Sequence, residues 1–302
     1  MLRGLDPQSD KFLTDLTRIT ERLNQAQRLI TSGRRVNSAS DDPDQLAQLL
    51  ESRTGLALTG QILSNLDRVQ AEVDGAEEAL QQAVSVAERV SVLGAQGATS
   101  IIGADQRATL ANEVDTLLQL LVNVARTTID GRYIFSGDSD GTAPYTFSPA
   151  MQPYPVSAFL GTASTRQVMH PAGTLFAVAR NAAQIFDDPA PDKNVFQSVN
   201  NLRLALQAND TAQVTAALAS VNTAIVHLNN QLAFYGATQN QVAAAVEFGN
   251  KQQLRLETQI ANIEDADMTE AILELNQARF VQETALSSQA KLRRLSLFDY
   301  LG

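Results

Sequence analysis

The chain has 302 residues and a formal net charge of −10 at pH 7, which disfavours broad binding to nucleic-acid phosphates. It contains no cysteine, which excludes disulfides and thiol chemistry, and no tryptophan. No apolar run is long enough to span a bilayer, and no signal-peptide pattern opens the sequence. We therefore expect no membrane insertion, no cleaved signal peptide and a core of Leu, Val, Ile and Ala from helices packed on helices.

The first predicted helix is apolar on one side only. Its apolar residues are spaced by four and three residues in alternation, which is a heptad pattern, and the pattern stops at Gly33, a plausible helix C-cap. Such a stripe has to be buried, either against the other terminal helix or against neighbouring subunits. In the second case the chain ends would become ordered only on assembly. The stripe comprises Phe12, Leu16, Ile19, Leu23, Ala26 and Ile30.

A long second helix is predicted to follow Asp42-Pro43, a capping aspartate with a first-turn proline. Gly55 and Gly60 weaken its first part, but an apolar stripe then runs over residues 62–94. A third helix is predicted over residues 110–124. These segments indicate long helices that pair along their lengths.

The middle of the chain differs from both flanks. Residues 131–193 hold most of the nine prolines, and β-prone pieces lie near 133–135, 156–160, 166–170 and 174–178. This composition predicts a small β-rich insert.

Helical periodicity resumes after the insert. A helix is predicted over 195–206, before a turn at Asn209-Asp210, and a longer one over 214–263. A last helix is predicted over about 268–297, which is rich in Ala and Gln and fits no clean heptad. Asp267 with Glu270 resembles a capping box before that last helix.

The pattern as a whole predicts a mainly α fold, an elongated antiparallel helical or coiled-coil bundle with a small β-rich insert. We expect terminal helices at 1–40 and 265–302, a helical rod from 41–130 and 194–264, and the insert at 131–193.

Few residues suggest chemistry. His170 and His227 are the two histidines, and the position of His227 beside an apolar stripe predicts a place near the surface. The Asp138–Gly141 segment is better explained as a tight turn than as a calcium loop, because its glycine comes too early and no glutamate closes it. Without a phosphate-binding loop or a nucleophile elbow, we expect no metal, no cofactor and no enzyme activity.

Two segments resemble a known family. Ser32-Gly33-Arg34-Arg35-Val36-Asn37-Ser38-Ala39-Ser40-Asp41-Asp42-Pro43 resembles the segment after the first helix of bacterial flagellins and their relatives, and Ile263-Glu264-Asp265-Ala266-Asp267-Met268 is similar to the segment before their last helix. The order of terminal helices, helical rod and variable insert agrees with that family.

Two branches of the family compete. Gly131-Arg132-Tyr133-Ile134-Phe135-Ser136-Gly137 with Ala143-Pro144-Tyr145, the Asn194-Val195-Phe196 segment and the ending Leu295-Ser296-Leu297-Phe298-Asp299-Tyr300-Leu301 resemble the hook–filament junction branch, the hook-associated proteins. The segment Asp265–Met268 leans toward flagellin itself.

The resemblance implies a structural component of the bacterial flagellum, outside the cell, that joins the hook to the filament. It implies export through the type III pathway. The implied partners are further copies of the chain, another hook-associated protein, flagellin and an export chaperone that binds within residues 265–302.

The resemblance also implies two groups of site residues. The terminal helices would form the assembly interface, through Phe12, Leu16, Ile19, Leu23, Ile30, Leu292, Leu295, Leu297 and Phe298. The family motif comprises Gly33, Arg35, Asn37, Asp41, Asp42, Pro43, Asp265 and Asp267.

Two other functions stay open. A minor or short flagellin would differ from a junction protein in the insert and in the last seven residues. An unrelated coiled-coil scaffold would form a stable monomer or dimer with ordered ends, and would leave the two matched motifs unexplained.

Overall fold

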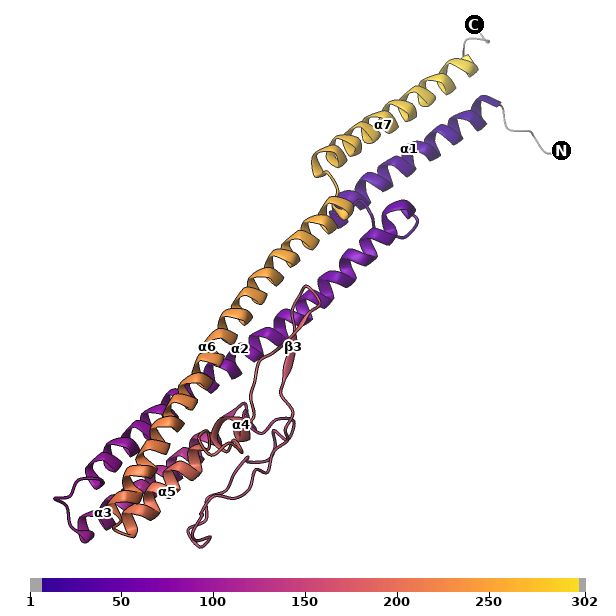
Figure 1. Ribbon diagram of the computed structural model, residues 1–302. Coiled ribbons are helices and arrows are strands. Elements are labelled where there is room, and N and C mark those ends of the chain that lie inside the picture. The colour runs from indigo at the N-terminus through magenta and orange to yellow at the C-terminus, as the bar shows by residue number, and fades with distance from the viewer. Residues whose placement is uncertain (1–6, 299–302) are drawn as a thin grey trace. The chain divides into compact units, whose positions relative to one another are not determined.

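The computed structural model describes residues 7–298, and the side chains of residues 10–291 (Figure 1). The chain divides into two compact units: unit 1 comprises Met1–Leu58 and Gln253–Gly302, and unit 2 comprises Thr59–Gln252. Two long helices, α2 (Pro43–Gly97) and α6 (Thr211–Glu264), contribute residues to both units. The division into terminal helices, helical rod and insert stays a prediction.

Unit 1 contains the terminal helices α1 (Pro7–Ser32) and α7 (Met268–Phe298), together with the first part of α2 and the last part of α6. The helices begin and end where the sequence predicts: α1 ends one residue before Gly33, α2 begins at Pro43 and α7 begins directly after Asp267. Gly33 has φ +69°, the left-handed conformation that glycine adopts without strain, and its N–H donates to Leu29 O at 2.9 Å.

Unit 2 is built on α2 and α6, which run antiparallel: Leu63 lies against Gly249 at one end, and Gly94 lies against Leu218 at the other. Helices α3 (Ala104–Ala125) and α5 (Val195–Gln207) pack against each other in the same unit. Helix α2 runs unbroken through Gly55 and Gly60, because packing of its apolar face outweighs the low helix propensity of glycine.

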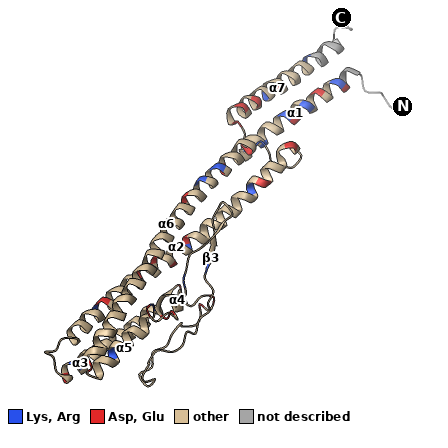
Figure 2. Cartoon of the chain, viewed as in Figure 1, with Lys and Arg blue, Asp and Glu red and all other residues tan. Residues whose placement is uncertain are grey.

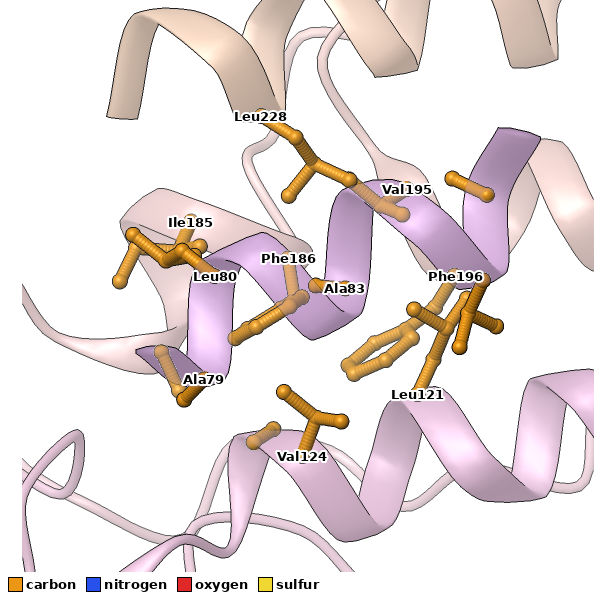
Figure 3. Packing of buried hydrophobic residues seen from close by; sticks show 14 of the residues in the cluster. Ala79, Leu80, Ala83, Leu121, Val124, Ile185, Phe186, Val195, Phe196 and Leu228 are labelled. Atoms are coloured by element: carbon orange, nitrogen blue, oxygen red, sulfur yellow. The ribbon is translucent and has the colours of Figure 1, made fainter. Parts of the chain in front are cut away.

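One hydrophobic core fills unit 2 (Figure 3). Its large side chains include Leu80 from α2, Leu121 from α3, Phe196 from α5 and Leu228 from α6, all fully buried. Gly97 lies so close to Leu206 of α5 that any side chain there would collide with it. The close approach of these helices therefore depends on small residues in α2.

The insert contains little strand. A two-residue turn, Asp130-Gly131 with both φ angles positive, joins β1 (Thr128–Ile129) to β2 (Arg132–Tyr133). The segments expected near 166–170 and 174–178 form β3 (Gln167–Met169) and β4 (Leu175–Ala177), which pair antiparallel. The segment expected near 156–160 forms only one isolated bridge, between Phe147 and Val156.

Aromatic packing joins the insert to the helices. The ring centroids of Phe186 and Phe196 are 5.4 Å apart, those of Tyr145 and Phe196 are 5.1 Å apart, and those of Phe135 and Phe186 are 6.1 Å apart. Phe186 belongs to α4 (Ala182–Phe186), a short helix that the periodicity did not reveal. The strand expected over 133–135 therefore ends at Tyr133, because the Phe135 ring is buried in this aromatic cluster and not paired in a strand.

Two further sequence expectations meet different outcomes. His227 is buried, not near the surface, because the insert covers its side of α6: its Nε2 lies 3.1 Å from the carbonyl oxygen of Gln184. The Asp138–Gly141 segment forms a turn, in which the N–H of Thr142 donates to Ser139 O at 2.9 Å.

Candidate assembly surface and the paired turns

The two turns of unit 1 pair with each other. The N–H of Arg35 donates to Glu264 O at 2.6 Å, and the N–H of Ala266 donates to Gly33 O at 3.0 Å. Arg34 and Asp265 form an antiparallel bridge between these bonds. The α1–α2 turn and the α6–α7 turn, which are more than 200 residues apart in sequence, are thereby joined by backbone hydrogen bonds.

A buried carboxylate reinforces this pairing. The side chain of Glu264 is only 4% exposed, and its two oxygens lie 2.7 Å from Arg34 Nε and 2.6 Å from Arg53 Nη2. The Arg53 contact is a hydrogen bond, whereas Arg34 approaches Oε1 outside hydrogen-bonding geometry and contributes as an ion pair. A buried carboxylate needs such partners, because its desolvation is costly.

Arg35 connects three segments. Its guanidinium donates to Asp42 Oδ2 at 2.9 Å and to the carbonyl oxygen of Ile263 at 2.7 Å. Asp42 also accepts from the N–H of Gln45 at 3.3 Å and so caps α2. One arginine therefore fixes the start of α2 against the end of α6.

The remaining motif residues shape the turns. Asp41 Oδ2 accepts from the N–H groups of Ser38 and Asn37 at 2.7 and 2.9 Å, and these bonds lower the pKa of the Asp41 carboxyl. The side chain of Asn37 donates to Arg34 O at 2.9 Å. Asp267 caps α7 by accepting from the N–H groups of Thr269 and Glu270 at 2.8 and 3.1 Å.

Helices α1 and α7 pack against each other (Figure 1). Arg22 and Glu274 form an ion pair at 2.6 Å, and the hydrogen bond between them raises the pKa of the Arg22 guanidinium. Ile19 and Ala26 of the α1 stripe are buried. The other stripe residues are only half-buried: Phe12, Leu16, Leu23 and Ile30.

Helix α7 directs mostly Ala and Gln side chains inward, whereas several large apolar side chains point outward. The positions withdrawn from solvent recur with heptad spacing, and two of them, Ala271 and Ala278, are fully buried. Leu273 is 57% and Phe280 70% exposed, and because they are seven residues apart they share one outer face. The heptad positions are Ala271, Leu275, Ala278, Gln282, Ala285 and Gln289, and Glu274, which pairs with Arg22, is half-buried beside them.

Sequence reasoning missed this heptad, because it searched for large apolar side chains and Ala and Gln occupy most of the positions. It also missed Glu264, Arg34 and Arg53 as a group; the signal was a glutamate directly before the turn residues of the second motif. The predicted interface residues Leu292, Leu295, Leu297 and Phe298 have side chains outside the described part of the chain.

Neither a cation site nor a membrane span is found in the described part of the chain. Across residues 7–298, no three His, Cys, Asp or Glu side chains gather as metal ligands would. Among the described helices, none combines the length and the apolar character needed to cross a bilayer.

Relatives of the chain come from flagella. A flagellar hook-associated protein 3 of Escherichia coli is 26% identical over 291 residues, which cover 89% of this chain and 90% of that protein. A flagellar filament 33 kDa core protein of Treponema phagedenis is 24% identical over 276 residues, 90% of each chain.

Solved structures share the fold. A putative flagellar hook-associated protein from Vibrio parahaemolyticus aligns over 74% of this chain and all of its own, with a TM-score of 0.64 and 18% identity. FlgL of Xanthomonas campestris aligns over 70% of this chain and all of its own, with a TM-score of 0.61 and 18% identity.

Two family models match the chain. The bacterial flagellin N-terminal helical region matches residues 8–140, and the bacterial flagellin C-terminal helical region matches residues 218–301. Together they cover well over half of the sequence, including both paired turns and α7. The chain therefore belongs to the bacterial flagellin family.

Proposed function

We propose that the chain is a structural, non-enzymatic component of the flagellum that joins the hook, through other hook-associated proteins, to the flagellin filament. The E. coli hook-associated protein 3 supports this, since the match extends over about nine-tenths of both chains. The proposed partners are further copies of the chain, another hook-associated protein and flagellin.

The outer face of α7 is the observation that carries the proposal. Leu273 and Phe280 are exposed to water in the isolated chain, on the side of α7 that faces away from its inward heptad positions. Large exposed apolar side chains that share a helix face mark a contact with another protein. The half-buried residues of the α1 stripe offer further apolar surface for contacts with other subunits.

Contacts of this kind build rings and tubes. When one face of a subunit binds a different face of the next, the contact repeats until it closes as a ring or continues as a helix. We place the assembly interface on the α1 stripe and on α7, with Leu292, Leu295, Leu297 and Phe298 as its C-terminal part.

We further propose export through the type III pathway, assisted by a chaperone that binds residues 265–302. The exposed apolar side chains of α7 support this, because a helix with such a face fits an apolar groove on a partner.

A minor flagellin is the second candidate. The T. phagedenis filament core protein favours it, because that protein matches over nearly the same share of the chain at nearly the same identity. The segment Asp265–Met268 also leans toward flagellin.

Deletion of the gene distinguishes the two. For a junction protein we expect cells with hooks but no filaments, and flagellin released into the medium. Missing or shortened filaments without released flagellin would support the minor flagellin, and normal filaments and swimming would contradict both.

Complementation of the deletion strain tests the assembly surface. We expect a Leu273→Ser/Phe280→Ser variant to be exported but to leave filaments absent, because the contact loses its apolar side chains. The matched control is Leu175→Ser, at a residue that is similarly exposed but lies in strand β4 of unit 2. Equal loss of filaments in both variants would argue against a specific role of α7.

A further inference from the structure

An apolar groove lies between the end of α2 and the start of α3. Its volume is about 420 Å³, and it is lined by Gln96, Thr99, Ile102, Gln106, Thr109 and Leu110. Val92 lies one turn before Gln96 on the same side of α2 and is 48% exposed, so it extends the apolar surface of the groove. The ion pair of Arg89 with Glu113, at 2.6 Å, lies next to Val92 and Thr109 along the two helices and borders one end.

Hydrogen bonds from a buried arginine hold the start of the loop that borders the groove. Arg107 is buried, and its guanidinium donates to Gly97 O at 2.9 Å, to Thr99 O at 2.8 Å and to Asn209 Oδ1 at 2.5 Å. These bonds fix both the end of α2 and the α5–α6 turn. A groove on a fixed loop needs little further ordering when it binds a partner.

The same loop presents an isoleucine to solvent. Ile101 is 92% exposed, whereas its neighbour Ile102 lines the groove. A single exposed apolar residue is common on protein surfaces. Ile101 differs because it lies directly beside an apolar groove. Each chain therefore carries both an exposed apolar side chain and a groove that could bind one.

The end of α2, the loop that follows it and most of α6 carry no charged residue. Residues 90–104 contain no Asp, Glu, Lys or Arg, and residues 211–246 of α6 contain none either. The side chains of Ser91 and Asn222 hydrogen-bond at 2.7 Å and join the two uncharged stretches. In Figure 2 the loop between α2 and α3 is accordingly drawn without blue or red.

The absence of charge restricts what can bind here. Two copies of a chain with net charge −10 repel each other across charged faces, and approach is least opposed where both surfaces are neutral. None of the six lining residues is charged, and the bordering Arg89 and Glu113 already pair with each other, so a charged segment would lose its hydration in the groove without gaining an unpaired partner there. An uncharged segment with an apolar tip meets no charge repulsion and loses no ionic hydration. The loop 99–103 is such a segment.

We propose that the α2–α3 groove of one copy binds Ile101 of a second copy. The contact goes beyond the proposed junction function, since it concerns unit 2 and does not depend on which flagellar structure the chain builds. Because loop and groove are adjacent in one chain, two copies can exchange their isoleucines reciprocally, or each copy can pass one on to the next.

Site-directed cross-linking of the full chain tests the contact. The natural sequence has no cysteine, so Ile101→Cys and Thr109→Cys each introduce a unique thiol. Mixed in equal amounts and treated with a short bis-maleimide, the two purified variants should give at least about tenfold more cross-linked dimer than Thr109→Cys alone. A mixture of Leu175→Cys with Thr109→Cys is the matched control, because Leu175 is also well exposed.

Three results would overturn the proposal: equal cross-linking with the Leu175→Cys control, no cross-linking at any concentration, or cross-linking that requires another flagellar protein. A second measurement uses sedimentation of cysteine-free chains. Ile101→Lys should weaken concentration-dependent association at least about tenfold, whereas Ile101→Met should preserve it. Unchanged association of Ile101→Lys would also contradict the contact.

The two proposals fail separately. Normal filaments after gene deletion would remove the junction function and leave the cross-link unaffected. A missing cross-link, together with hooks that lack filaments after deletion, would remove only the Ile101 contact.

Discussion

Glu264 holds together two turns that are far apart in the sequence. Its carboxylate is shared by Arg34 and Arg53, and its backbone carbonyl accepts from the N–H of Arg35. Both arginines remain about half exposed, so they keep much of their hydration while the carboxylate is buried. Because only the carboxylate is buried, the desolvation cost that usually offsets the attraction within a buried ion pair is smaller here.

We expect Glu264→Gln to lower the free energy of unfolding of unit 1 by about 2 kcal/mol, because it removes a hydrogen bond and an ion pair to charged groups. Hydrogen exchange at residues 33–36 and 264–266 would report the loss locally. Glu257→Gln on the same helix is the control, since Glu257 is exposed and accepts a bond only from Gln253 among the described residues. Equal effects of the two variants would mean that the shared carboxylate has no special role.

Asp187 links stability to pH. Burial raises the pKa of its carboxyl above the ordinary value of 3.8, although hydrogen bonds from Asn194 and Tyr145 act in the opposite direction. The folded chain thus binds this proton more tightly than the unfolded chain does. The free energy of unfolding therefore falls as pH rises from 3.8 through the folded pKa.

Asp187→Asn should consequently raise the free energy of unfolding more at pH 7 than at about pH 3.5, because burial opposes only the ionised form of the carboxyl. Urea denaturation at the two pH values measures this difference. Asp192→Asn, at an exposed position of the same segment, should give no such dependence on pH. A gain of equal size at both pH values for Asp187→Asn would contradict the assignment to burial.

At the scale of elements, the helix boundaries that carry a capping residue or a left-handed turn were predictable because they depend on local chemistry, whereas α3 begins at Ala104, ahead of its apolar stripe, and α4 was not predicted. Gly33 and Asn209 have positive φ angles, of 69° and 54°, at the ends of their helices. Asp210 caps α6 by accepting from the N–H of Gln213, and Asp267 caps α7 by accepting from the N–H of Glu270. Short-range hydrogen bonds and φ preferences determine such turns, so the residue types alone indicate them.

Other features of the elements were not predictable in this way. The heptad of α7, the burial of His227 and the pairing of the two turns depend on which distant segment lies opposite. A single sequence does not contain that information, because periodicity shows that a helix face is buried and not what covers it.

Two glycines of α2 also show that the sequence does not reveal which segment packs against a helix face, and substitutions at them test the packing directly. Gly60 is exposed with no neighbouring atom where a Cβ would stand, so Gly60→Ala should raise the free energy of unfolding by about 0.5–1 kcal/mol through helix propensity. Gly97→Ala, at the last residue of α2, gains less from helix propensity and collides with Leu206, and it should therefore be destabilising. Thermal unfolding followed by circular dichroism measures both, and a similar gain for the two variants would mean that the approach of α5 to α2 is looser than described.

The whole molecule combines two units with very different cores. Unit 2 buries one large cluster that includes several fully buried aromatic side chains, whereas the buried apolar residues of unit 1 are few and none of them is aromatic among the described residues. Stability is distributed accordingly, because local opening costs least where few apolar contacts are lost. The terminal helices are then the part of the chain that gains most from contact with neighbouring copies.

Hydrogen exchange of the dilute full-length chain in increasing urea should show this difference. We expect the amides of α1 and α7 to lose protection at lower urea than those of residues 62–94 and 214–245. Ile19→Asp should abolish the protection of α1 and α7, because it places a charge in the buried contact between them, while the protection of unit 2 stays within experimental error. The same variant should fail to restore filaments in the deletion strain. If Ile19→Asp also removed protection from residues 62–94, the two units would unfold as one, and the separation of an assembly surface from an independently stable core would be wrong.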